Sequence, residues 1–265
     1  MRVAVMTPTF NERANIDEFV RRTRAAVPDA HIFVVDDASP DGTGERVIEL
    51  ATSDPLLSLI SRDGARGYAA ASRDGLTRIS AQGFDAIVTI DCDLSHDPRD
   101  IPMLLEALSR GADVSIGSRY VPGGGVRNWP LSRRLLSRWG NWYTSLMLGL
   151  GVHDCTSGFR AYRSEVVRSG VIAATTSDGY SFLTEVLYRL RGGFLRADGA
   201  QDAQWLTDSA PVAPVRWQII EVPIILTERL AGESKMNKTI ISESMRRVTL
   251  WGLRRLMSQA QGRRR

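Results

Sequence analysis

The 265-residue chain is 43% apolar and 24% charged, a balance that indicates a globular protein with a sizeable core. Its two cysteines are too few for a disulfide framework or a zinc cluster. Residues Met1–Pro8 lack a signal-peptide pattern, and no stretch approaches the roughly 18 apolar residues that span a membrane. We therefore expect a cytoplasmic protein without a membrane-spanning helix.

Five short apolar runs separated by helical patterns occupy the first half of the chain. The expected strands are Val3–Met6, His31–Val35, Leu57–Ile60, Ala86–Ile90 and Asp113–Ile116. Asn15 with Glu18, and Asp97 followed by Pro98, are typical of helix starts. This alternation predicts an α/β fold in which helices cover a mostly parallel sheet.

The second half is expected to be more helical. Helical patterns cover Leu131–Leu150, Tyr180–Arg191 and Lys238–Met257, and a strand pair is split at Pro223. The polar stretch Asp198–Pro214 has the character of an insertion before this strand pair.

The net charge is only +4, but its distribution is uneven. Val121–Leu150 holds four arginines and Met245–Arg265 holds seven, and neither segment contains an acidic residue. Both segments predict a site for an anionic partner, although a solvated basic surface has the same composition. Neither carries a zinc-finger or RNP-type motif, so we expect no nucleic-acid partner.

Acidic residues follow three of the expected strands. They are Glu12, Asp36, Asp37, Asp91 and Asp93. Ligands of such sheets bind outside the carboxyl ends of the strands, so we expect all five residues to converge on one crevice. Like charges at close range repel one another, and a cation or a donor-rich ligand would neutralise them.

Asp91 and Asp93 stand one residue apart at the end of the fourth strand. In extended backbone both side chains project to the same side and can reach one ion. Carboxylate oxygens suit Mg²⁺ or Mn²⁺, which take further ligands from water and substrate phosphates. Phosphohydrolases of the haloacid dehalogenase type also carry Asp-x-Asp, but near the start of their fold, whereas three strand-helix units precede Asp91.

Six motifs, in order, resemble one family. They are Pro8–Glu12, Val35–Thr43, Asp91–His96, Gly117–Tyr120, Thr156–Arg160 and Gly232–Lys235. Together they resemble the dolichyl- and polyprenyl-phosphate mannosyltransferases, which are inverting family 2 glycosyltransferases with the GT-A fold. The resemblance covers about residues 3 to 256 and implies transfer of mannose from GDP-mannose to a polyprenyl phosphate.

The resemblance also implies roles for individual residues. Donor binding would fall to Pro8, Phe10, Glu12, Val35, Asp37, Asp91, Cys92, Asp93, Arg119, Arg229 and Lys235, with the metal ion on Asp91 and Asp93. The acceptor phosphate would fall to Arg119, Arg133 and Ser137, and the implied catalytic residues are Asp93, Arg119 and Arg133. Glu185 is expected either to line the acceptor site or to lie on a solvated helix face.

Two positions depart from the family pattern near the expected donor site. Phe10 stands where a tyrosine is usual, which removes one hydroxyl. The stretch Arg66–Ala71 replaces a loop that is richer in glycine.

The expected organisation is a single GT-A domain over residues 1–258, followed by a basic tail, 259–265. Within the domain, 1–120 would be the nucleotide-binding half and 121–258 the acceptor- and membrane-facing half. Apolar side chains recur at helical spacing beside the arginines, as in an interfacial helix; they are Leu131, Leu135, Leu136, Trp139, Trp142, Tyr143, Leu146 and Met147. Core packing is the alternative for these side chains.

The tail offers a second amphipathic candidate, because Arg247 and Arg254 are seven residues apart and share a face near Trp251. We therefore expect a protein that is peripheral at the cytoplasmic face of the membrane. An integral membrane partner remains an open alternative.

Two rival functions share these motifs. The same fold can use UDP-glucose or another sugar nucleotide, or a small hydroxyl acceptor. A non-catalytic subunit that binds a sugar nucleotide and docks on a membrane partner is the second rival. The intact pair of Asp91 and Asp93 argues against this second rival.

Overall fold

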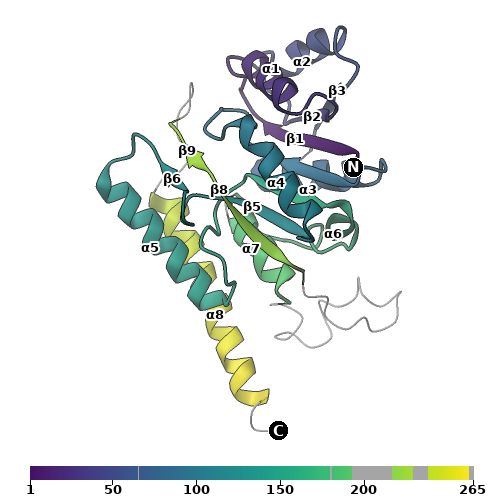
Figure 1. The fold of residues 1–265 in the computed structure, drawn as a ribbon. Coiled ribbons are helices and arrows are strands. Elements are labelled where there is room, and N and C mark those ends of the chain that lie inside the picture. The colour runs from purple at the N-terminus through teal and green to yellow at the C-terminus, as the bar shows by residue number, and fades with distance from the viewer. Residues whose placement is uncertain (65, 180, 193–216, 229–237, 263–265) are drawn as a thin grey trace.

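A computed structural model describes residues 1–64, 66–179, 181–192, 217–228 and 238–262 (Figure 1). Three expectations lie outside these residues: the insertion Asp198–Pro214, and the donor roles of Arg229 and Lys235. The last three arginines of the basic tail also lie outside them.

The first half alternates strands and helices as expected. Its elements are β1 (Val3–Thr9), α1 (Ile16–Ala26), β2 (His31–Asp36), α2 (Thr43–Ala51), β3 (Leu57–Ser61), α3 (Tyr68–Ser80), β4 (Ala86–Thr89), the short 3₁₀ helix η1 (Pro98–Asp100), α4 (Ile101–Ser109) and β5 (Val114–Ser118). All five predicted strands are present, and most run one to three residues beyond the predicted ends. The apolar runs predicted these strands correctly because a buried parallel strand is apolar on both faces.

One predicted helix cap is confirmed and one is wrong. The Asp97 side chain accepts a hydrogen bond from the Arg99 N–H at the start of η1, with Pro98 in the first position. Asn15 makes no such cap for α1, since its side-chain amide instead donates to the Glu12 carboxylate at 2.7 Å. Glu18 pairs with arginines one turn further along α1.

The second half adds two helices that stand apart from the sheet, together with further strands. Its elements are β6 (Gly125–Val126), α5 (Leu131–Leu148), β7 (Arg160–Arg163), α6 (Ser164–Arg168), α7 (Ser181–Leu190), β8 (Ile219–Pro223), β9 (Ile225–Leu226) and α8 (Lys238–Gly262). The strand pair split at Pro223 is confirmed, because β8 joins the main sheet and β9 pairs with β6.

The main sheet has seven strands in the order β3-β2-β1-β4-β7-β5-β8. Every pairing is parallel except those of β7, which runs antiparallel to both β4 and β5. The mostly parallel, helix-covered sheet expected from the sequence is therefore confirmed. Since β7 and β8 belong to the second half of the chain, both halves build the same sheet.

The side chains of the sheet alternate between two apolar layers. Val5 and Val34 pack with Phe19, Val47 and Leu104 from α1, α2 and α4 on one face. The opposite layer holds Met6, Val35, Leu76, Val166 and Val186, so it is covered by α3, α6 and α7. The carboxyl ends of β1, β2 and β4 therefore emerge between two packed layers, where polar residues can gather.

Helices α5 and α8 lie side by side at the end of the molecule away from β3 (Figure 1). The Tyr143 and Thr249 hydroxyls share a hydrogen bond of 2.8 Å, and Arg255 donates to the Met147 carbonyl at 3.2 Å. Gly252 allows the close approach, since a Cβ there would lie 2.6 Å from the Met147 side chain. Within the described ranges, no helix combines the length and the apolar character that crossing a bilayer requires.

Candidate active site

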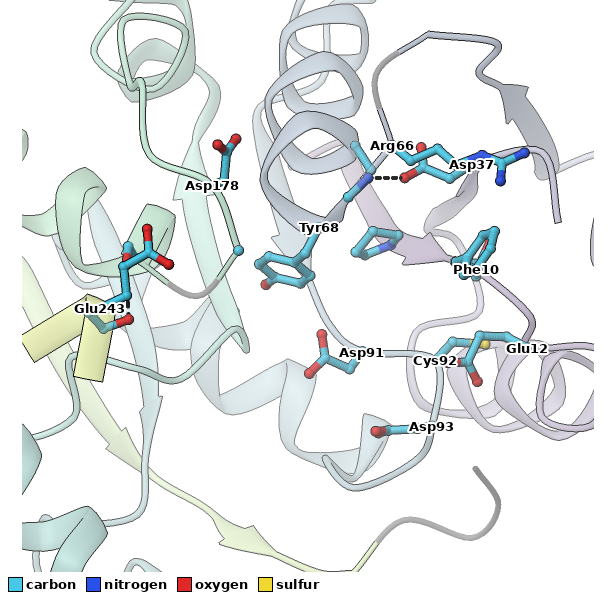
Figure 2. A pocket seen from close by; sticks show the side chains of 17 residues that line it. Phe10, Glu12, Asp37, Arg66, Tyr68, Asp91, Cys92, Asp93, Asp178 and Glu243 are labelled. Atoms are coloured by element: carbon cyan, nitrogen blue, oxygen red, sulfur yellow. Dashed lines mark hydrogen bonds between the residues drawn. The ribbon is translucent and has the colours of Figure 1, made fainter. Parts of the chain in front are cut away.

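A cavity of about 610 Å³ opens where β1, β2 and β4 end (Figure 2). Its walls are formed by Pro8, Thr9, Phe10, Glu12, Asp37, Arg66, Gly67, Tyr68, Ala71, Asp91, Cys92, Asp93, Asp178, Gly179, Ser181, Glu243 and Ser244. Most of the residues expected to hold the donor thus line one space. A cavity of this volume is within the usual range for small-molecule sites.

Asp91 and Asp93 lie at one side of this cavity, between its two ends (Figure 2). The Asp91 side chain is 32% exposed, and its Oδ2 lies 3.9 Å from Nδ1 of His96. Asp93 is buried, and its Oδ1 accepts a hydrogen bond of 3.0 Å from the Ser95 N–H. That bond fixes the turn after β4 so that both carboxylates border the cavity.

The donor set suits a hard divalent cation with few protein ligands. No three His, Cys, Asp or Glu side chains of the described chain are grouped so that they could hold an ion. Two carboxylates are nevertheless enough for Mg²⁺ or Mn²⁺, which retain water and take substrate phosphate oxygens. Cys92 does not suit such an ion as a thiolate, because burial raises the pKa of its thiol well above the ordinary value.

His96 is a buried neighbour of this pair. Burial, assisted by the positive charge of Arg119, lowers the pKa of His96 to about 4. The imidazole is therefore neutral at pH 7, and its ring packs at 5.4 Å from the Phe159 ring. This agrees with a structural role for His96.

Asp37 lies at one end of the cavity, and its carboxylate is held from two sides. Its carboxylate accepts hydrogen bonds from Arg62 Nη1 and from the Gly67 N–H, the latter at 2.7 Å. Arg62 is 9% exposed and also contacts Asp74 at 3.2 Å. No sequence motif pointed to Arg62, although an arginine directly after a strand that borders an acidic crevice is a pattern to look for.

Of the five acidic residues expected to converge on one crevice, four line the cavity. Asp36 is buried and does not line the cavity; its carboxylate accepts hydrogen bonds from the Thr9 hydroxyl and from the N–H and hydroxyl of Ser39. It therefore stabilises the turn after β2. Val35 is fully buried, with its side chain in the core against α3, so any contact with the donor would have to come from its backbone.

The far wall of the cavity brings together distant segments of the chain. Asp178, Gly179 and Ser181 precede or begin α7, whereas Glu243 and Ser244 belong to α8 (Figure 2). The Ser181 and Ser244 hydroxyls share a hydrogen bond of 2.9 Å across the junction. No sequence motif pointed to this wall, because it forms only where α7 meets α8.

Glu185 holds the loop that carries this wall, and it is neither solvated nor part of the cavity lining. Its carboxylate is fully buried and accepts hydrogen bonds from the N–H groups of Thr176 and Ser177. Arg189 balances the charge at 2.8 Å. Both expectations for Glu185 are therefore corrected to a role in holding the loop.

Arg119 lies outside the cavity lining, in a buried ion pair with Asp154. Its Nε and Nη2 donate to the two carboxylate oxygens, both at 2.7 Å, and Nη2 also donates to Thr156. Burial alone would lower the pKa of Arg119, but the charge of Asp154 outweighs this and raises it. The guanidinium is thus permanently charged, and two of its nitrogens are engaged within the protein.

The three residues expected at the acceptor phosphate lie around two aromatic rings. The Trp129 ring contacts both arginines, with Arg133 at 3.9 Å and Arg119 at 5.9 Å from its centroid. Tyr120 lies under Arg119 and donates its hydroxyl proton to Ser137 at 2.6 Å. Arg119, Arg133 and Ser137 therefore belong to one cluster, which Trp129 and Tyr120 bridge and which α5 borders.

Comparison with known proteins places the chain in a family. A model of the family "Glycosyl transferase family 2" matches residues 4–170. Over 98% of its length the chain is 41% identical to a polyprenol monophosphomannose synthase of Mycolicibacterium smegmatis, of which it covers 91%. It is also 41% identical to an undecaprenyl-phosphate mannosyltransferase of Micrococcus luteus, covering 96% of the chain and 95% of that protein.

A dolichol-phosphate mannosyltransferase of Pyrococcus furiosus is 34% identical over 94% of the chain, which spans 63% of that longer protein. Among solved structures, a glucosyl-3-phosphoglycerate synthase of Mycobacterium tuberculosis with Mn²⁺ and UDP matches with a TM-score of 0.60. That match has 20% identity and covers 96% of this chain and 79% of the other, so it shows the fold. The chain belongs to glycosyltransferase family 2 and has the GT-A fold.

Proposed function

We propose that the protein transfers mannose from GDP-mannose to a polyprenyl monophosphate, with inversion at the anomeric carbon. The observation that carries this proposal is the position of Asp91 and Asp93, on one cavity with Phe10 and Asp37 at one end. The names of the relatives with 41% identity support a mannosyl donor and a polyprenyl phosphate acceptor. The shared sheet supports the view that residues 1–258 work as one domain.

The acceptor in this proposal needs orientation more than deprotonation. A phosphate monoester has a second pKa near ~6, so it is mostly dianionic at pH 7 and already nucleophilic. A hydroxyl acceptor would instead require a general base. Charge-assisted hydrogen bonds from Arg119 and Arg133 would hold the phosphate oxygens in line with the anomeric carbon.

Asp91 and Asp93 fit the role of metal ligands because both border the cavity and both supply hard oxygen donors. When bound there, Mg²⁺ or Mn²⁺ would neutralise the charge that develops on the departing diphosphate. The two carboxylates would hold the ion between the nucleoside end and the sugar end of the donor.

A lipid acceptor requires contact with a membrane surface. Helices α5 and α8 expose a large apolar surface, formed by Leu131, Leu135, Leu136, Trp139, Trp142, Leu146, Leu250, Leu253, Leu256 and Met257. Arginines 127, 133, 134 and 138 accompany this surface, which suits an anionic lipid surface. We include peripheral binding at the cytoplasmic face in the proposal, and an integral membrane partner would cover the same helices.

The deciding experiment is incubation of the purified chain with Mn²⁺, a short polyprenyl phosphate and a panel of labelled nucleotide sugars. Product mass identifies the sugar and lipid, and the anomeric coupling in the NMR spectrum reports inversion. We expect mannosyl transfer from GDP-mannose. Transfer only from UDP-glucose would show that the donor is UDP-glucose and not GDP-mannose. Binding without turnover would favour the non-catalytic rival.

A further inference from the structure

Arg66 lines the cavity at the end where Phe10 and Asp37 lie (Figure 2). Its guanidinium carbon lies 5.4 Å from the centroid of the Phe10 ring. The side chain is exposed, and within the described part of the chain it forms no ion pair with a carboxylate. The guanidinium therefore lies against an aromatic wall of the cavity.

The backbone next to Arg66 is fixed, which gives the side chain a defined origin. The Gly67 N–H donates to Asp37 at 2.7 Å, and Gly67 has a φ of +124°, a conformation that a side chain would strain. The loop before α3 is thereby tied to the carboxylate at the end of β2. Arg66, Phe10 and Asp37 consequently form three sides of one small space.

The chemistry of this space matches a flat, hydrogen-bonding ring system. Aromatic rings and arginine guanidinium planes both stack on nucleobases. A carboxylate beside them can accept N–H groups from the edge of a base, and its oxygens offer about four acceptor positions in all. Phe10 lacks the hydroxyl that a tyrosine would offer, so the contact it contributes is through its ring face.

We propose that Arg66 is a specificity-determining residue whose guanidinium stacks on the nucleobase of the donor beside Phe10, and that it favours a purine. The proposal rests on the proposed function for the presence of a nucleotide, and it adds the residue that selects the base. A bicyclic purine offers more stacking surface to the guanidinium than a pyrimidine does. Arg66 would therefore contribute to donor affinity and not to the chemical step.

Calorimetric titration of the full chain with GDP, ADP and UDP, with Mn²⁺ in excess, tests this role. We expect Arg66→Ala to weaken GDP and ADP binding by about three- to tenfold, and UDP binding less. Arg66→Lys keeps the charge but loses the planar group, so it should recover only part of the loss. With GDP-mannose, KM should rise in parallel while kcat stays within about twofold.

Arg2→Ala is the matched control, because Arg2 makes a similar contact with Phe84, at 5.1 Å, away from the cavity lining. It should leave nucleotide affinity unchanged. Unchanged GDP, ADP and UDP affinities in Arg66→Ala, or an equal loss for all three, would overturn the role of Arg66 alone. A wild-type preference for UDP over GDP would overturn the purine preference and the GDP-mannose donor together, yet the UDP affinities would still reveal any stacking by Arg66. Absence of any nucleotide binding would overturn both proposals.

Discussion

Arg119 and Asp154 are joined by two parallel hydrogen bonds of 2.7 Å in the interior of the protein. Asp154 also accepts the backbone N–H groups of Arg119, Thr156 and Ser157, so one carboxylate gathers the chain after β5 and the chain before β7. The arginine expected to bind the acceptor is thus held by an internal anion before any substrate arrives.

Asp154→Asn should destabilise the protein strongly. The substitution preserves shape but leaves a buried guanidinium without its counter-charge, a change that costs about 3–5 kcal/mol of unfolding free energy. Urea denaturation at pH 7 measures the loss, with Asp113→Asn, a more exposed aspartate in the same sheet region, as the control. Equal stability of wild type and Asp154→Asn would contradict the importance of the pair.

The stability difference between wild type and Asp154→Asn depends on pH with a defined sign. Burial alone would raise the pKa of Asp154, but the charge and hydrogen bonds of Arg119 lower it below the ordinary 3.8. The stabilisation is therefore complete above pH 3.8 and is lost as the pH falls through the lower folded-state pKa. Denaturation curves at several pH values should show a constant gap between wild type and Asp154→Asn from pH 7 to about 5, which narrows below about 4.

Asp93→Ala should abolish transfer without unfolding the protein. Loss of a metal ligand removes several kcal/mol of charge stabilisation, so kcat/KM should fall by about 100-fold or more. Circular dichroism checks the fold, and excess EDTA should cause a similar loss that added Mn²⁺ reverses. Full activity in EDTA would refute the metal role of the two carboxylates.

Arg133→Ala should impair use of the acceptor phosphate far more than binding of GDP. Arg133 lies on the Trp129 ring, outside the lining of the nucleotide cavity, and a lost charge-assisted hydrogen bond costs about 1.5–3 kcal/mol. The KM for polyprenyl phosphate should therefore rise by about 10- to 100-fold. Arg110→Ala, which removes an exposed side chain directly after α4, is the control, and equal loss of GDP affinity would count against the assignment.

Replacing Leu135 and Trp142 together by serine should weaken binding to anionic lipid vesicles. These side chains are 60% and 59% exposed, and burying each in lipid contributes roughly 1.5–3 kcal/mol. Vesicle sedimentation should show at least a tenfold weaker association. Ile48→Ser, which removes an apolar side chain 58% exposed on α2, should leave binding unchanged. If both variants bind like wild type, the surface of α5 has another partner.

The sequence predicted the sheet well because its central strands are apolar on both faces. It missed β7, because Arg160 and Arg163 leave no apolar run in that short segment. Arg160 is nevertheless fully buried, since its guanidinium donates to the carbonyls of Cys155, Ser157 and Leu183. A charge satisfied by backbone carbonyls leaves no signal in the hydrophobic periodicity of the sequence.

The candidate site was predictable where it follows strand ends and unpredictable where it needs tertiary contacts. Asp37, Asp91 and Asp93 border the cavity as expected from their positions after β2 and β4. Asp36 and Asp37 are adjacent in sequence. Only the structure shows that Asp36 is buried in the turn after β2, whereas Asp37 borders the cavity. The roles of these residues in substrate binding stay predictions.

The two ends of helix α8 have different surroundings. Glu243 and Ser244, near its start, belong to the far wall of the cavity, whereas Leu253 and Met257 lie about 14 to 20 Å further along the same rod, at 48% and 58% exposure. Because an α-helix is stiff over this length, a tilt of its apolar end would also displace its other end. If α8 docks on a lipid surface as proposed, a movement of its apolar end would therefore shift the wall of the cavity that Glu243 and Ser244 help to form.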